Sequence, residues 1–199
     1  EEKEEAMRFL TSPDLFGEIL KDFETIGYVG EETNKLVCYL AAVSRKLPEP
    51  LSVIIQSRSA AGKSSLQDAV LTFVPEEDFI KYTRITDQAI YYKDENSLVH
   101  KLLAIEEIVG VGGAAYSLRA LQSNGTLSLA YTAKDAATGK MRTEEHRVNG
   151  PLALNGTTSE PEIDPELADR CIIAAVDESR EMTLRIHNRQ RESHTLEGY

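Results

Sequence analysis

The segment at residues 57–64, S-R-S-A-A-G-K-S, constrains the fold of this chain more than any other feature. It directly follows an apolar, β-branched run, L-S-V-I-I-Q at residues 51–56, and it opens a helical pattern at residues 63–73. The apolar run is typical of a buried parallel strand. A loop that leads from such a strand into a helix presents backbone N–H groups to a phosphate. The sequence therefore predicts a phosphate-binding loop.

Two side chains of this loop carry the expected chemistry. We expect Lys63 to reach the β- and γ-phosphate oxygens of ATP and the hydroxyl of Ser64 to bind Mg²⁺. The first position of the loop departs from the usual pattern, because Ser57 stands where glycine is expected. The residues that we expect to bind the nucleotide are consecutive: Ser57, Arg58, Ser59, Ala60, Ala61, Gly62, Lys63, Ser64 and Ser65.

Apolar runs and helical patterns alternate along the rest of the chain. Strands are predicted at residues 51–56, 79–83, 98–105, 152–154 and 171–176, and helices at residues 63–73, 86–92, 114–122 and 164–169. Such alternation implies a parallel sheet with helices on both faces. The predicted fold class is α/β, with a parallel five-stranded sheet sandwiched by helices.

Two segments depart from this alternation. Residues 12–26 and 36–47 have helical spacing, and Ser12 and Pro13 are predicted as the N-cap and the first residue of the first helix. Residues 126–131 and 141–148 have period-two character around a stretch rich in turn formers, which predicts an inserted β-hairpin. We divide the chain into an N-terminal helical segment (1–50), an α/β core (51–177) with the hairpin near 126–148, and the start of a helical lid (178–199).

Two carboxylates, Glu106 and Glu107, follow the predicted strand at residues 98–105. A parallel strand brings its last residues to the same sheet edge as the phosphate loop. One carboxylate there can hold Mg²⁺ through water, and the other can polarise the attacking water. We expect Glu106 to take the metal role and Glu107 the base role, and the two roles could also be shared differently.

The charge of the chain bears on its partners. A net charge of −11 at pH 7 argues against a broad surface for wrapping duplex DNA, because neutralising phosphates requires clustered Lys and Arg. A local basic loop remains compatible with this charge. Lys134, Lys140 and Arg142 lie near the predicted hairpin tip, where they are suited to contact nucleic-acid phosphates in a central channel.

The sequence also predicts a compartment. No apolar run approaches the roughly 20 residues that cross a bilayer, and the acidic N-terminus, E-E-K-E-E, is unlike a signal peptide. We therefore expect no membrane partner. Cys38 and Cys171 lie in apolar surroundings and are predicted to be buried free thiols of a reducing compartment, the cytoplasm.

The order of these motifs resembles AAA+ ATPases. It comprises the phosphate loop, the acidic strand end, a polar strand end at residues 154–158, and the run from Asp164-Pro165 to Arg170. With a hairpin between the acidic and the polar strand, the chain is most similar to minichromosome-maintenance helicases and their relatives. Residues 101–107, 121–140 and 189–198 resemble the ATPase domain of large bacterial primase–helicase-type proteins of mobile elements.

This resemblance implies a DNA helicase or translocase that acts in replication of a mobile element. It implies a homo-oligomeric ring, a hexamer, acting on single-stranded or forked DNA. It places Thr158 at the sensor of the γ-phosphate, with Asn155 and Thr157 as alternatives, and Arg170 at the arginine finger that completes a neighbour's site. A second sensor could be any of three arginines near the end of the chain: Arg180, Arg185 and Arg189.

Two other functions stay open at this point. An AAA+ protein remodeller or regulatory switch would hydrolyse ATP with the same residues, and only the hairpin chemistry favours DNA. A small-molecule kinase with the same phosphate loop would need an acceptor pocket and a lid over it, whereas the insertion here is a hairpin. Arg170, suited to act in trans, also argues against the kinase.

Overall fold

The computed structural model describes residues 2–86, 88–108, 114–134 and 139–192. At its centre is a five-stranded sheet in the order β2-β3-β6-β1-β7, in which every neighbouring pair is parallel. The strands are β1 (Val53–Gln56), β2 (Phe79–Tyr82), β3 (Lys101–Ile105), β6 (Leu152–Thr158) and β7 (Ile172–Ala175). The predicted parallel five-stranded sheet is confirmed.

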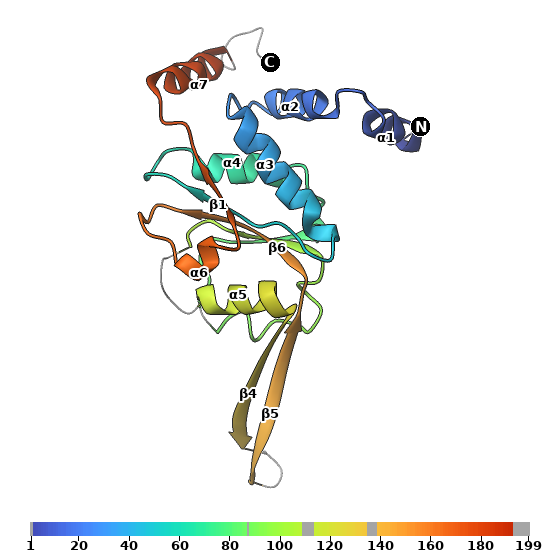
Figure 1. The fold of residues 1–199 in the computed structure, drawn as a ribbon, viewed down its shortest axis with the longest axis vertical. Coiled ribbons are helices and arrows are strands. Elements are labelled where there is room, and N and C mark those ends of the chain that lie inside the picture. Colours follow the sequence, from blue (N-terminus) through green and yellow to red (C-terminus); the bar gives the residue numbers. More distant parts are fainter. Residues whose placement is uncertain (1, 87, 109–113, 135–138, 193–199) are drawn as a thin grey trace.

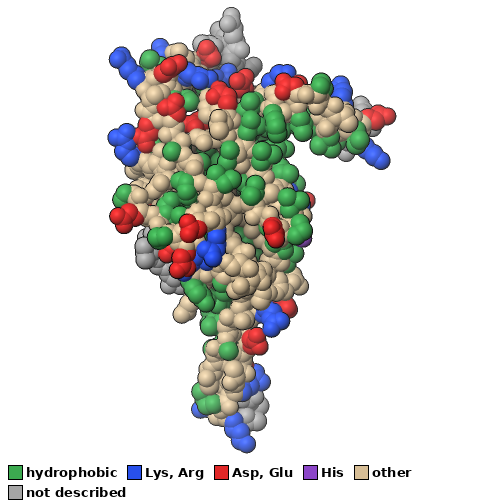
Figure 2. Space-filling view, in the orientation of Figure 1, with side chains coloured by type: hydrophobic (Ala, Val, Ile, Leu, Met, Phe, Trp, Pro, Cys, Tyr) green, Lys and Arg blue, Asp and Glu red, His purple; other side chains and the backbone are tan. Residues whose placement is uncertain are grey.

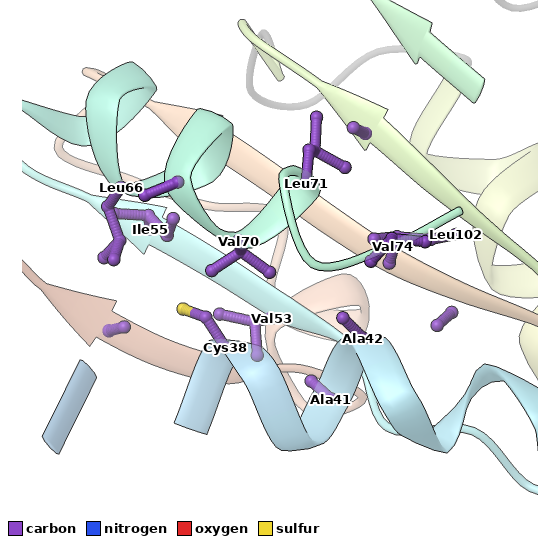
Figure 3. Close-up of a cluster of buried hydrophobic side chains, with 14 of the residues drawn as sticks. Cys38, Ala41, Ala42, Val53, Ile55, Leu66, Val70, Leu71, Val74 and Leu102 are labelled. Carbon is purple, nitrogen blue, oxygen red and sulfur yellow. The ribbon is translucent and has the colours of Figure 1, made fainter. Parts of the chain in front are cut away.

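Helices cover both faces of this sheet (Figure 1). α3 (Glu32–Val43) and α4 (Lys63–Leu71) lie on one face, and α5 (Ala114–Asn124) and α6 (Pro165–Ala168) lie on the other. Figure 3 shows the core on the α3 and α4 side, where Val53 and Ile55 of β1 meet Cys38 and Val70. Alternate residues of β1 and β3 point into a second core that contains Ile54. The central strands β1, β3 and β6 are therefore buried on both sides, as their apolar sequences require.

The inserted hairpin consists of β4 (Thr126–Lys134) and β5 (Met141–Asn149). Its strands pair antiparallel, and it projects from the body of the molecule (Figure 1). Leu127 and Val148, at the base of the hairpin, are buried in the same core as α5, so the hairpin is anchored at its root. The predicted insertion is confirmed, and its strands are longer than expected.

The remaining helices lie at the end of the molecule opposite the hairpin tip (Figure 1). They are α1 (Glu2–Leu10), α2 (Leu15–Thr25) and α7 (Arg180–Glu192), and two short 3₁₀ helices occur at Ser44–Lys46 and Glu76–Asp78. Among the described residues, no helix combines the length and the apolar character needed to cross a membrane. Cys38 is buried and Cys171 partly buried, both as free thiols. Burial raises the pKa of Cys38 to about 12.

Three local predictions are wrong. The second helix of the chain begins at Leu15 and is capped by Asp14, whose carboxylate accepts the N–H of Gly17 at 3.1 Å, so Ser12 is not its N-cap. The described part of residues 86–92 forms successive turns, each closed by a hydrogen bond between residues three apart, instead of a helix. β3 begins only at Lys101, because the preceding residue, His100, has a φ of 57° and leaves the strand conformation.

Candidate functional site

The phosphate loop leaves the carboxyl end of β1 and enters α4. Gly62 is the N-cap of α4 with a φ of 93°, a backbone conformation that glycine adopts without steric cost. Ala60 also has a positive φ, 63°, and therefore bears some backbone strain. The start of the loop is fixed to β6, because the N–H of Ser57 donates to the carbonyl oxygen of Thr158 at 3.3 Å.

Lys63 lies inside this loop. Its Nζ donates to the carbonyl oxygens of Ser57 at 2.8 Å and Arg58 at 2.6 Å, and the residue is buried. An ammonium group has three donors, and these two bonds leave the third for a phosphate oxygen. The neighbouring side chains of Ser59, Ser64 and Ser65 are exposed and therefore accessible to a ligand.

The two predicted carboxylates lie at the same sheet edge, beyond β3, and have different partners. Glu106 Oε1 is 2.7 Å from the ammonium of Lys81, which belongs to β2. This hydrogen bond lowers the pKa of Glu106 and keeps the carboxylate ionised. Glu107 Oε1 instead accepts the hydroxyl of Ser159 at 3.2 Å. The two carboxylates therefore have separate surroundings, as separate roles would require.

Gln67 ties the phosphate-loop helix to this acidic edge. Its Nε2 donates to the carbonyl oxygen of Asn155 at 2.7 Å and to that of Ile105 at 3.3 Å, directly before Glu106. Ser64 lies three residues before Gln67 on α4, so both project from the same side of the helix. This contact brings the start of α4 to the end of β3, where Glu106 follows.

The available donors fit a magnesium ion. A hydroxyl from Ser64 and an ionised carboxylate from Glu106 are hard oxygen ligands, and Mg²⁺ usually takes one or two protein ligands together with water and phosphate oxygens. Within the described ranges, no group of three or more His, Cys, Asp or Glu could hold a metal ion without further ligands. The donor set therefore suits a nucleotide-bound Mg²⁺ better than a site built from protein ligands alone.

The polar end of β6 is engaged in holding the loops of this edge. Thr158 is buried, and its hydroxyl donates to the carbonyl oxygen of Ile108 at 2.8 Å. The hydroxyl of Thr157 donates to the carbonyl oxygen of Glu106. Asn155 lies deeper in the sheet, opposite Val53, and its side-chain amide has no hydrogen-bond partner among the described groups. The three candidates for the sensor therefore all lie on β6, the strand beside β1 and the phosphate loop.

A cavity of about 640 Å³ adjoins the phosphate loop. Its walls come from three places: the loop itself at residues 58–62, a second loop at residues 27–31, and the segment from β7 into α7. The second loop contributes Tyr28 and Val29, and α7 contributes Met182 and Ile186. These side chains form an apolar region beside the phosphate site, of the kind that receives the flat face of a base.

Sequence patterns did not identify these cavity residues. Glycines at positions 27 and 30 mark residues 27–31 as a loop, but nothing in the sequence shows that this loop lies against α7. In the structure, Glu31 joins this loop to the segment before α7, because its carboxylate accepts the N–H of Asp177 at 2.5 Å. Asn34 adds a hydrogen bond to the carbonyl oxygen of Ala175 at 2.8 Å.

Of the three candidate arginines on α7, only Arg189 lines this cavity. Arg185 Nη2 is 3.4 Å from Glu32, on α3, and Arg180 is exposed at the start of the helix. A cation on the cavity wall can reach a bound anion. The geometry therefore favours Arg189 among the candidates for a second sensor.

Arg170 lies at the opposite edge of the sheet. It precedes Ile172, which pairs with Val53 at the start of β1, whereas the phosphate loop follows the end of β1. Its Nε donates to the hydroxyl of Ser123 at 3.0 Å, and the side chain is exposed. Arg170 and the phosphate loop therefore lie at opposite ends of β1.

The basic residues of the hairpin lie near its tip, where Lys and Arg side chains gather at the end of the molecule (Figure 2). The register pairs Lys134 with Met141 and Ala133 with Arg142, so Lys134 and Arg142 point to opposite faces of the ribbon. Arg142 also donates to Glu144 at 2.6 Å. Lys134 and Lys140 are exposed. The tip is therefore basic on both faces, with Arg142 partly neutralised.

Comparison with known proteins assigns the chain to a family of P-loop domains. The model of a family described as the MTBMA_p00010 P-loop domain matches residues 1–197. No curated protein matches the chain. The matched residues include the phosphate loop, the acidic edge and the hairpin.

Proposed function

The chain belongs to the MTBMA_p00010 P-loop domain family, an α/β P-loop fold that supports nucleotide binding and hydrolysis, and from this premise we propose that it is an ATP-hydrolysing AAA+ motor domain that moves DNA. The observation that carries the proposal is the division of the site between two sheet edges. Lys63, Glu106 and Glu107 lie at the carboxyl edge of the sheet, and Arg170 lies at the amino edge.

In this proposal the chain's own residues bind and orient the triphosphate. Backbone N–H groups of residues 58–63 and the third donor of Lys63 bind its phosphate oxygens. Bound Mg²⁺ neutralises phosphate charge, and Ser64 and Glu106 are the residues that would hold it. Glu107 orients the attacking water and accepts its proton, with Ser159 holding the carboxylate. The apolar walls from Tyr28 and Ile186 receive the base.

Assembly follows from the position of Arg170. A cation that stabilises the transferring phosphoryl group contributes strongly to turnover, and this arginine can serve only a neighbouring subunit. The proposal therefore includes a homo-oligomer, a hexameric ring, as in the minichromosome-maintenance-like helicases that the motifs resemble. The hairpin would project into the channel and contact single-stranded DNA through Lys134 and Lys140.

The experiment that tests the proposal measures ATP hydrolysis with and without single-stranded DNA. We expect DNA to stimulate hydrolysis, and we expect Lys63→Met to abolish ATP binding while the chain stays folded, since Lys63 bonds only loop carbonyls. Lys134→Ala combined with Lys140→Ala should weaken DNA binding and flatten its dependence on salt. ATP hydrolysis that never responds to DNA would contradict the motor.

A second candidate, an AAA+ protein remodeller, is favoured by one observation. The hairpin stem carries Glu144 and Glu145, which pair with Arg142 and Arg147 and so reduce its positive charge. A remodeller would retain ATP hydrolysis and respond to an unfolded polypeptide instead of DNA. Running the same assay with an unfolded protein as the added substrate separates the two functions.

A further inference from the structure

Lys81 links the phosphate-loop helix to the acidic strand end. Its Nζ lies 2.6 Å from Asp68 Oδ1, on α4, and 2.7 Å from Glu106 Oε1, beyond β3. One ammonium group thus pairs with two carboxylates that belong to different elements. No sequence motif singled out Lys81 or Asp68.

The ion pair between Lys81 and Glu106 affects how a metal cation binds to Glu106. Both Lys81 and Mg²⁺ are attracted to the same carboxylate, and each repels the other. Lys81 does not have to move into solvent when it gives up Glu106, because Asp68 still holds it. Asp68 therefore provides a second partner that keeps the ammonium group in place.

We propose that Lys81 is a positioning residue that competes with Mg²⁺ for Glu106, and that Asp68 lowers the cost of this exchange by retaining Lys81. In the absence of metal, the ammonium holds the Glu106 carboxylate in place at the end of β3. When Mg²⁺ binds with ATP, Lys81 shifts its pairing to Asp68. The inference rests on the proposed function, which gives Glu106 the metal role.

The test is an equilibrium titration of ATP binding against Mg²⁺ concentration, without hydrolysis. Lys81→Met removes the competitor, so the Mg²⁺ concentration for half-maximal effect should fall by about fivefold, the size of a partly exposed ion pair. Asp68→Asn leaves Lys81 with Glu106 alone, so that concentration should rise by a similar factor. Opposite shifts are not expected from general damage to the fold.

The double variant, Lys81→Met with Asp68→Asn, shows whether Asp68 acts through Lys81 or through its own negative charge. If Asp68 acts through Lys81, then Asp68→Asn should have no effect in the Lys81→Met background. If Asp68 only adds negative potential near the metal, its removal should weaken Mg²⁺ binding equally in both backgrounds. The second result would overturn the proposal, and so would unchanged or weaker Mg²⁺ binding by Lys81→Met.

Lys101→Met is the matched control. Lys101 lies on the neighbouring strand β3, its side chain is 27% exposed against 30% for Lys81, and its carboxylate partner is Asp78 at the opposite end of the sheet. It should leave the Mg²⁺ titration unchanged. A parent chain that binds ATP with no dependence on Mg²⁺ would instead contradict the metal role of Glu106, and one that binds no ATP would overturn the proposed function and this inference together.

Discussion

The carboxylate of Glu178 accepts the backbone N–H of Arg58 at 3.2 Å and also pairs with the guanidinium group of Arg58. Arg58 is the second residue of the phosphate loop, and Glu178 lies between β7 and α7. The hydrogen bonds from Arg58 lower the pKa of Glu178, so the carboxylate is ionised at neutral pH. Glu178 thus occupies a backbone N–H and a guanidinium group of the loop, which are groups that could otherwise bind a phosphate.

The first prediction is that Glu178 competes with the nucleotide. Glu178→Gln removes the negative charge and keeps the shape, so the Kd for ATP should fall by about two- to fivefold, as expected for an exposed ion pair. Isothermal titration calorimetry measures this change. Glu181→Gln, an exposed carboxylate of α7, is the control and should leave the Kd unchanged. Weaker ATP binding by Glu178→Gln would mean that Glu178 orders the loop for its ligand.

The second prediction separates the two acidic residues. Glu107→Gln should retain ATP binding and lose about 10²–10⁴-fold in turnover, because it removes the group that orients water. Glu106→Gln should raise the Mg²⁺ requirement for ATP binding. Single-turnover hydrolysis and Mg²⁺ titration measure the two effects. If Glu107→Gln hydrolysed ATP normally while Glu106→Gln did not, the assigned roles would be reversed.

The fold and the phosphate site were predictable from sequence because their signals are local. The β-branched run before Ser57, the glycine at position 62 and the acidic residues after β3 each lie within one strand–loop–helix unit. The parallel sheet then follows from general rules of connection. These signals suffice to place Lys63 and Glu106 at one sheet edge.

The rest of the site depends on contacts between distant segments. Asn34 and Ala175 are joined by a hydrogen bond across 141 positions of sequence, and periodicity contains no signal for such a contact. The sequence likewise gives no sign that Lys81 contacts Glu106, because this contact depends on the pairing of β2 with β3. The predicted start of α2 at Ser12 is wrong because two nearby residues can cap this helix. Asp14, two residues after Ser12, supplies the capping carboxylate.

The third prediction concerns backbone strain in the loop. Ala60 has a φ of 63°, where an L-residue bears about 1–2 kcal/mol of steric cost, while glycine costs about 0.5–1 kcal/mol in chain entropy. Ala60→Gly should therefore raise the free energy of unfolding by about 0.5–1 kcal/mol in urea titrations. Ala61→Gly, a neighbour without a positive φ, should lower it. Destabilisation by Ala60→Gly would show that the strain is compensated by contacts of the Ala60 methyl group.

The last prediction tests assembly through Arg170. If Arg170 completes a neighbouring site, the ATPase rate should rise faster than linearly with protein concentration, because subunits must meet to form each site. Arg170→Ala should keep ATP binding and lose that rise. Its hydrogen bond to Ser123 gives a control, since Ser123→Ala removes this side-chain partner and keeps the guanidinium group, which also donates to the carbonyl oxygen of Glu166.

Mixing two inactive variants makes the test specific for a shared site. Lys63→Met subunits retain Arg170, and Arg170→Ala subunits retain the phosphate loop. Where they meet in one orientation, an intact loop faces an intact arginine, so the mixture should recover part of the parent activity although each variant alone has little. Activity strictly proportional to concentration, with no recovery in the mixture, would place all catalytic groups in one chain. Because Arg170 lies at the sheet edge opposite the phosphate loop, that result would exclude it from catalysis and favour a monomeric, kinase-like enzyme.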